Sequence, residues 1–266
     1  MTVKRDIALV TGASSGIGEA LALVCAQHRY DLILVARNQQ KLNALAIQLN
    51  QEYGVEVSVK PYDLTAPGAV KMLSEELLSE SRQVDILINN AGVLEHGAFV
   101  DIAPEEHQNI VQLNISALTA MLAHILPTMV ARGSGRVLNV ASIGAFQPMP
   151  SVATYSATKA FVLSLSESLA EEVRGTGVTV TALCPGLTAT NMMATAQKKS
   201  PMLVNIPNLV VADAYNVARK GFRGCLKGKT IVVPGVYLFV SILSRATPKW
   251  LVRCVTGFIG RATISR

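Results

Sequence analysis

Seven short runs rich in β-branched residues alternate with longer helical stretches along this 266-residue chain. Such alternation is typical of a parallel sheet, because each parallel connection needs a crossover of a dozen or more residues. We therefore expect an α/β fold: a doubly wound, parallel seven-stranded sheet with helices on both faces. The expected strands are 7–10, 32–36, 55–59, 85–89, 136–141, 178–183 and 230–233, and the expected helices are about 17–28, 38–52, 67–81, 105–131, 153–174 and 212–226.

Polar residues and glycines directly follow six of these strands. In an open parallel sheet the ligand crevice lies outside the carboxyl ends of the strands. The pattern therefore predicts a single crevice built from six strand ends. The residues concerned are Thr11-Gly12, Arg37, Asp63, Asn89-Asn90-Ala91-Gly92, Ser142 and Pro185-Gly186.

A glycine-rich loop, Thr11-Gly-Ala-Ser-Ser-Gly-Ile-Gly18, joins the first strand to the first helix. Gly12 permits a tight turn, Gly16 lets the backbone approach a diphosphate, and Gly18 lets the helix lie close to the strand. The helix that follows presents free amides and the positive end of its dipole to the phosphates. The loop therefore predicts a Rossmann-type dinucleotide site. Its expected cofactor-binding residues are Gly12, Ser14, Ser15, Gly16, Ile17 and Gly18.

The end of the second strand bears on which dinucleotide binds. Sites for NAD(H) usually carry an acidic residue there, which binds the ribose hydroxyls. This chain has Ala36 and then Arg37. An uncompensated guanidinium suits the 2′-phosphate of NADP(H), whereas the alternative is a surface arginine at a strand end. We therefore predict NADP(H) rather than NAD(H). Asp63 and Leu64 are expected beside the adenine, and Asn90, Ala91 and Gly92 are expected where the cofactor passes close to the backbone.

Tyr155 and Lys159 stand one helical turn apart on the same face of a predicted helix. A phenol of pKa about 10 is a poor acid–base catalyst at neutral pH. An ammonium roughly 5 Å away, at an effective dielectric of about 20, favours the phenolate by about 3 kcal/mol, or about two pKa units. Tyr155 could then exchange a proton with a carbinol near neutral pH. Ser142 would supply a second hydroxyl to hold the same oxygen.

Together these motifs resemble the short-chain dehydrogenase/reductase family, in its compact single-domain branch. The matching residues lie in order between residue 5 and about residue 190. The C-terminal third carries little of this resemblance. The matches are Thr11-Gly-x3-Gly-Ile-Gly18, Asp63, Asn89-Asn-Ala-Gly92, Asn114, Ser142, Tyr155-x3-Lys159 and Pro185-Gly186-x-Thr188.

The resemblance implies a role for each matching residue of the catalytic group. Tyr155 would be the acid in reduction and the base in oxidation, and Ser142 would orient the carbonyl oxygen. Lys159 would lower the pKa of Tyr155 and bind the nicotinamide ribose, and Asn114 would hold a water that links Lys159 to solvent. The simpler alternatives are a strand-end cap for Ser142, a satisfied helix amide for Asn114 and a turn at Pro185-Gly186. The residues implied to flank the nicotinamide carboxamide are Pro185, Gly186 and Thr188.

The segments expected to cover the nicotinamide, 143–150 and 187–196, carry no charged residue. They favour an apolar ketone, aldehyde or acyl chain over a sugar or an acid. The leading hypothesis is an NADPH-dependent carbonyl reductase. A 3-oxoacyl thioester reductase acting on carrier protein or coenzyme A is an alternative, and a non-catalytic NADP(H)-sensing or membrane-docked binding protein is another. We expect one domain over 1–235, with a substrate loop at about 187–210 that is mobile over 197–210.

The C-terminal extension, 236–266, is apolar and basic. Ten Lys or Arg and no acidic residue follow Asp213, so with a net charge of +6 for the whole chain, residues 1–213 carry a net charge of −4. This local charge does not indicate nucleic-acid binding, and aromatic residues are too sparse for a base-stacking platform. The extension either packs on the protein or a neighbouring subunit, or lies on anionic lipid with Trp250 at the interface.

The remaining expectations concern metals, location and assembly. The four cysteines and four histidines are scattered along the chain, so we propose no metal and expect reduced thiols. We expect a cytoplasmic protein, which would be peripheral at a membrane surface if the extension binds lipid. Residues 152–166 carry one charge, Lys159. A helix apolar nearly all round must be covered on both sides, which predicts a homodimer or homotetramer.

Overall fold

The computed structural model describes residues 5–190, 193, 211–235, 237–238, 247–248, 250–254 and 256–257. Nearly all of the predicted substrate loop after residue 190, and much of the C-terminal extension, lie outside this part of the chain. The described residues form a seven-stranded sheet in the order β3-β2-β1-β4-β5-β6-β7, parallel throughout. The strands are β1 (Ile7–Thr11), β2 (Asp31–Val35), β3 (Val57–Lys60), β4 (Ile86–Asn89), β5 (Gly135–Val140), β6 (Val178–Leu183) and β7 (Ile231–Val232).

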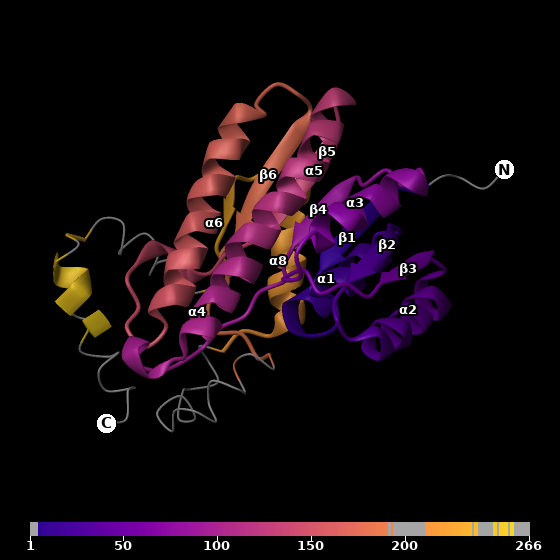
Figure 1. Ribbon diagram of the computed structural model, residues 1–266. Coiled ribbons are helices and arrows are strands. Elements are labelled where there is room, and N and C mark those ends of the chain that lie inside the picture. Colours follow the sequence, from indigo (N-terminus) through magenta and orange to yellow (C-terminus); the bar gives the residue numbers. More distant parts are fainter. Residues whose placement is uncertain are drawn as a thin grey trace.

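Helices cover both faces of the sheet (Figure 1), which confirms the predicted doubly wound Rossmann-type fold. Successive strand residues point to opposite faces, so Leu9 joins one core cluster while Ala8 and Val10 join the other. The first cluster lies under α3 (Ala69–Ser79), α5 (Leu118–Ala131) and α6 (Ala153–Glu172). The second lies under α1 (Gly16–Gln27), α2 (Gln39–Tyr53) and α8 (Ala214–Leu226).

The strand order reverses between β1 and β4, which pair directly through Leu9 and Leu87. In this class of sheet the ligand crevice opens at that reversal, outside the carboxyl ends of the strands. The predicted elements are confirmed with their ends shifted by one or two residues, apart from the helix over 105–131.

That helix is not a regular α-helix. A π-helical segment, Gln112–Ala117, separates α4 (Pro104–Val111) from α5. The buried Asn114 amide lies in this segment and bonds the backbone of Val93, whose N–H donates to Asn114 Oδ1 at 2.9 Å. Single π-turns inside α-helices are frequent at functional sites. The widened turn is therefore tied to a side chain that belongs to the candidate site.

The run Pro104–Ala131 is, within the described residues, the one helix long and apolar enough to span a membrane. Its apolar side chains include Met121, Ile125 and Met129, which are buried in the core cluster against the sheet. These buried side chains make it a core helix that packs against the sheet.

Candidate active site

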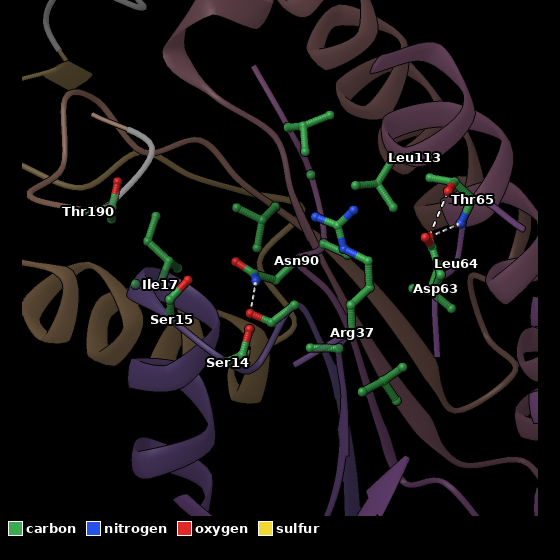
Figure 2. Close-up of a pocket in the computed structure, with 18 of the residues that line it drawn as sticks. Ser14, Ser15, Ile17, Arg37, Asp63, Leu64, Thr65, Asn90, Leu113 and Thr190 are labelled. Atoms are coloured by element: carbon green, nitrogen blue, oxygen red, sulfur yellow. Dashed lines mark hydrogen bonds between the residues drawn. The ribbon is translucent and has the colours of Figure 1, made fainter. Parts of the chain in front are cut away.

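The carboxyl ends of the strands form a cleft, which Figure 2 shows with the glycine loop on one side and the turn after β3 on the other. Polar side chains from the loops after β1, β2, β3, β4 and β6 line it. Most residues that the sequence places at a cofactor site line this cleft. They are Gly12, Ser14, Ser15, Gly16, Ile17, Arg37, Asp63, Leu64, Asn90, Ala91, Gly92, Tyr155, Lys159 and Pro185.

The glycine loop has the geometry that its sequence predicts. Gly12 and Gly16 have φ values of +67° and +61°, which favour glycine. A Cβ on Gly18 would overlap the carbonyl oxygen of Gly12, so Gly18 supports the loop from behind the cleft. Ser15 is the N-cap of α1 and its side chain makes no capping hydrogen bond. The first-turn amides of α1 are therefore available to an anion.

Thr11 fixes the loop after β4 against the glycine loop. Its hydroxyl oxygen accepts hydrogen bonds from the backbone N–H groups of Asn90 and Ala91, both at 3.0 Å. The Asn90 side-chain amide donates back to the carbonyl oxygens of Thr11 at 3.0 Å and Gly12 at 3.2 Å. Two strand ends from distant parts of the sequence are thereby held in register around the cleft.

Arg37 reaches into the cleft between Ser14 and Asn90 on one side and Asp63 on the other (Figure 2). Within the described residues, no carboxylate oxygen lies within 4.0 Å of its guanidinium. The prediction of an uncompensated charge nevertheless needs correction. Hydrogen bonds from Thr65 lower the pKa of Asp63, and the Arg37 charge lowers that pKa further. Asp63 therefore balances part of the guanidinium charge.

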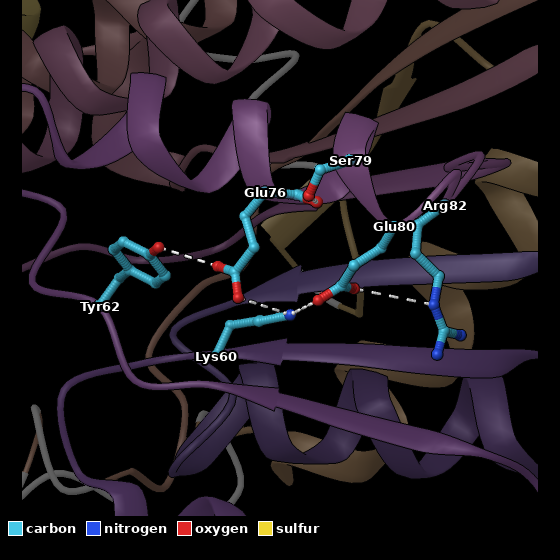
Figure 3. Close-up of polar contacts among 6 residues, drawn as sticks. All are labelled: Lys60, Tyr62, Glu76, Ser79, Glu80 and Arg82. Atoms are coloured by element: carbon cyan, nitrogen blue, oxygen red, sulfur yellow. Dashed lines mark hydrogen bonds and ion pairs between the residues drawn. The ribbon is translucent and has the colours of Figure 1, made fainter.

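Tyr62 also lines the cleft, and it belongs to none of the motifs from which the site was predicted. Its hydroxyl donates to Glu76 Oε2 at 2.8 Å, and Glu76 Oε1 accepts from Lys60 Nζ at 2.9 Å (Figure 3). The buried Lys60 ammonium also donates to Glu80, which pairs with Arg82. This chain of ion pairs between β3 and α3 fixes the Tyr62 ring at the wall of the cleft.

Tyr155 and Lys159 lie on one face of α6, as predicted, with Lys159 Nζ 5.7 Å from the centre of the Tyr155 ring. The predicted lowering of the Tyr155 pKa is wrong. Burial raises the pKa of Tyr155, and the hydrogen bond with Ser142 only partly offsets this. Burial also lowers the pKa of Lys159 from 10.5 to about 8. Desolvation is the largest cause of both pKa shifts, and the spacing of the two residues in the sequence does not report their burial.

Ser142 follows β5, and its side chain makes hydrogen bonds with two partners. Its hydroxyl oxygen accepts a hydrogen bond from the Gly144 N–H at 3.1 Å, which caps the 3₁₀ turn Ile143–Phe146, and the side chain also bonds Tyr155. The strand-end cap and the contact with Tyr155 are therefore compatible functions of one hydroxyl.

Gly92 separates Asn114 from Lys159. A Cβ on Gly92 would lie 3.1 Å from Asn114 Oδ1 and 3.4 Å from Lys159 Nζ, so the two polar groups meet across its Cα. Lys159 Nζ donates to the Val140 carbonyl at 2.8 Å. Asn114 Nδ2 donates to Val93 O and Thr158 Oγ1, each at 3.0 Å. Asn114 is thus a satisfied, buried amide beside Lys159, and the water-holding role stays a prediction.

The turn after β6 is covered by a residue from the C-terminal extension. Pro185 lines the cleft, but Tyr237 lies so close to Gly186 that a Cβ there would overlap its ring. A backbone hydrogen bond from Leu187 reaches the Tyr237 side chain. Thr188 is buried, and its hydroxyl donates to Gly186 O at 2.9 Å. Gly186 and Thr188 therefore shape the turn from behind, while Pro185 faces the cleft.

Two residues at this turn were not predicted. Thr190 lines the cleft beside the glycine loop, with its Cγ2 atom 3.1 Å from where a Gly16 Cβ would stand. Tyr237 is the second. Thr190 was not singled out, although it lies within the segment 187–196 that was expected to cover the nicotinamide. Tyr237 belongs to no motif and reaches the site through a contact between distant segments, so no local signal could have identified it.

The fold and this cleft together define a dinucleotide-binding oxidoreductase of the Rossmann class. The family model for short chain dehydrogenases matches residues 6–201, and the chain belongs to that family. A short-chain dehydrogenase from Sphingobium yanoikuyae, solved in complex with NADPH, is 33% identical, with a TM-score of 0.81 and coverage of 91% of this chain and 93% of that one.

Two further relatives differ in what they act on. The bulky-bulky ketone specific alcohol dehydrogenase from Comamonas testosteroni is 30% identical, with a TM-score of 0.78 and coverage of 92% of each chain. A very-long-chain 3-oxoacyl-CoA reductase from Pyrenophora tritici-repentis is 36% identical over 219 residues, which span 80% of this chain and 64% of that protein.

Proposed function

We propose that this protein is an NADP(H)-dependent oxidoreductase that interconverts a carbonyl and a secondary alcohol on an apolar substrate. The observation that carries the proposal is that Tyr155 and Lys159 line the same cleft as the glycine loop and Arg37. A proton donor and a dinucleotide cradle therefore share one space. Binding of NADPH by the relative from S. yanoikuyae supports the choice of cofactor.

The residues of the cleft fit a dinucleotide phosphate. The first-turn amides of α1 and the side chains of Ser14 and Ser15 would hold the diphosphate, because no capping side chain occupies that helix end. Arg37 would hold the 2′-phosphate by charge-assisted hydrogen bonds. When bound, NADPH supplies the hydride that reduces a carbonyl carbon.

At neutral pH the phenol of Tyr155 is in the protonated form that a reduction requires. Because burial raises the pKa of Tyr155, its hydroxyl carries its proton throughout the neutral range and can donate it to a carbonyl oxygen. Ser142, bonded to Tyr155, is placed to hold the same oxygen. Lys159 is cationic below a pH of about 8, and its charge stabilises the phenolate left after proton transfer.

An apolar substrate is supported by two uncharged segments at this end of the sheet: the turn Ile143–Phe146 packs against α6, which carries Tyr155, and Leu187 is exposed in the turn after β6. The ketone-specific relative from C. testosteroni agrees with an apolar ketone. A 3-oxoacyl thioester is the second candidate, which the relative from P. tritici-repentis favours. A non-catalytic NADP(H) sensor would not need Tyr155, Ser142 and Lys159 in the same cleft.

The test is NADPH oxidation across a panel of apolar ketones, aldehydes, 3-oxoacyl thioesters and a polar sugar, with NADH as the comparison cofactor. We expect turnover of an apolar carbonyl with NADPH and much weaker turnover with NADH. Comparable turnover of the sugar would contradict the apolar pocket. No oxidation with any carbonyl, in a protein that still binds NADPH, would favour the sensor.

We also propose self-association through α6, whose outer face exposes Ala157, Ala160, Phe161 and Ser164. Small and apolar side chains on an exposed helix face suit close contact with a second copy. Light scattering should show a dimer or tetramer at micromolar concentration, and Phe161→Glu should reduce its mass to that of the monomer. A wild-type monomer would overturn this proposal.

A further inference from the structure

The C-terminal extension presents large apolar side chains to solvent. Trp250, the one tryptophan of the chain, is 60% exposed, and Leu251 is 41% exposed on the same short helix. Arg253 and Cys254 of that helix are also exposed. Tryptophan is enriched at membrane–water interfaces, where its ring enters the acyl boundary while its N–H stays at headgroup level. The expectation that the extension packs on the protein or on a neighbouring subunit does not account for these two exposed side chains within a single copy of the chain.

The charge of the extension identifies the kind of surface that would cover them. Residues 236–266 contain no Asp or Glu, and their cations are interleaved with the apolar residues. Such a segment is attracted to an anionic surface. A second copy would bring the same cations to a symmetric contact, where like charges repel. The cations are Arg245, Lys249, Arg253, Arg261 and Arg266.

We propose that the extension docks the protein on an anionic lipid surface, with Trp250 and Leu251 entering the headgroup boundary and the cations facing lipid phosphates. The apolar runs 236–243 and 250–259 are each shorter than the roughly 18 residues that a spanning helix needs, so the proposal is docking at the surface and not a membrane span. The docking stands on the exposed side chains and the charge, and it does not depend on the proposed function.

The same extension touches the candidate active site, because Tyr237 covers Gly186 at the turn after β6. Figure 1 shows the C-terminal helix, in yellow, on the side of α4 and α6 and away from the β3 edge. Docking would therefore bring the α6 side of the cleft toward the bilayer. If the proposed function holds, an apolar substrate dissolved in lipid would reach the cleft from that side.

The test is flotation of the full chain with vesicles of phosphatidylcholine and phosphatidylserine, compared with phosphatidylcholine alone. We expect the protein to float with the mixed vesicles only, and to be released by high salt. The double variant Trp250→Glu, Leu251→Glu should reduce the bound fraction by about tenfold or more. A matched control is Leu78→Glu on α3, where the side chain is 69% exposed and no cationic run surrounds it, and it should float as the wild type does.

The outcomes separate the occupants of this surface. Failure of the wild type to float with the mixed vesicles overturns the proposal, as does unchanged flotation of the double variant. If the double variant loses oligomer mass in light scattering and the wild type never floats, Trp250 and Leu251 bind a second copy instead. The affinity for NADPH reports whether each variant is folded. If the double variant no longer bound NADPH, Arg253→Gln would test the electrostatic contribution to lipid binding in its place. Since flotation needs no turnover, the result is independent of the catalytic proposal.

Discussion

The buried charge of Lys159 should lower the free energy of unfolding of the protein. Its side chain is 4% exposed, and its ammonium bonds only the Val140 carbonyl among the contacts that the structure describes. Burial lowers its pKa from 10.5 to about 8. At about 1.36 kcal/mol for each pKa unit, this difference makes the charged lysine cost about 3 kcal/mol of folding free energy at pH 7.

Lys159→Met removes the charge while keeping most of the side-chain volume. It also removes a hydrogen bond to Val140 worth about 1 kcal/mol, so we expect the variant to be more stable than the wild type by about 2 kcal/mol at pH 7. The sign of the pH dependence follows from the lowered pKa. Below about pH 8 the cost is complete, and it is relieved as the pH rises from about 8 through 10.5, above which unfolded and folded lysine are both neutral.

Urea unfolding of the cofactor-free proteins at pH 7 and pH 10 measures this directly. The stability advantage of Lys159→Met should largely disappear at pH 10, while catalytic turnover is lost at both pH values. Lys220→Met, at an exposed position on α8, is the matched control and should change stability little at either pH. A variant less stable than the wild type at pH 7, or an advantage independent of pH, would refute the assignment of a desolvated cation.

Three further changes test the cleft and its wall. Arg37→Ala should raise the Kd for NADPH by about 10- to 100-fold, as expected for the loss of hydrogen bonds to a charged phosphate. In the same fluorescence titration the Kd for NADH should be unchanged. An equal loss of affinity for both cofactors would show that Arg37 does not bind the 2′-phosphate. Because the Tyr237 ring covers Gly186, Tyr237→Ala should raise KM for the carbonyl substrate more than it lowers kcat. Tyr237→Phe keeps the ring and should retain most of the activity. An equal loss of kcat/KM in both variants would assign the effect to the hydroxyl. Glu76→Gln should lower the free energy of unfolding by about 1 kcal/mol at pH 7 after solvent screening. The pKa of Glu76 is lowered chiefly by Lys60, so this difference should vanish as acid protonates the native carboxylate; a difference that persists in acid would point to packing.

The sequence predicted the fold and the cleft because both follow from short-range patterns. Strand runs and their terminal residues converge wherever parallel strands share an edge, so Gly12, Arg37 and Asn90 could be placed together from the strand pattern alone. The contribution of Tyr237 could not be predicted, because its contact with Gly186 depends on how the C-terminal segment returns to the sheet.

Electrostatic balance and local backbone geometry could not be predicted either. The spacing of Tyr155 and Lys159 fixes their attraction but not their burial, and burial determines the direction of both pKa shifts. The π-helical turn at Asn114 accompanies hydrogen bonds between Asn114 and Val93, a partner on another loop. Neither effect has a signal in the residues next to the motif.

The most direct test of the central proposal is Tyr155→Phe, assayed with NADPH and a reactive ketone alongside a titration of NADPH binding. We expect turnover to fall by at least about 10²-fold, the range of a lost general acid, while the Kd for NADPH is unchanged. Turnover that survives the loss of this hydroxyl would show that another group donates the proton, and the proposed role of Tyr155 would be wrong.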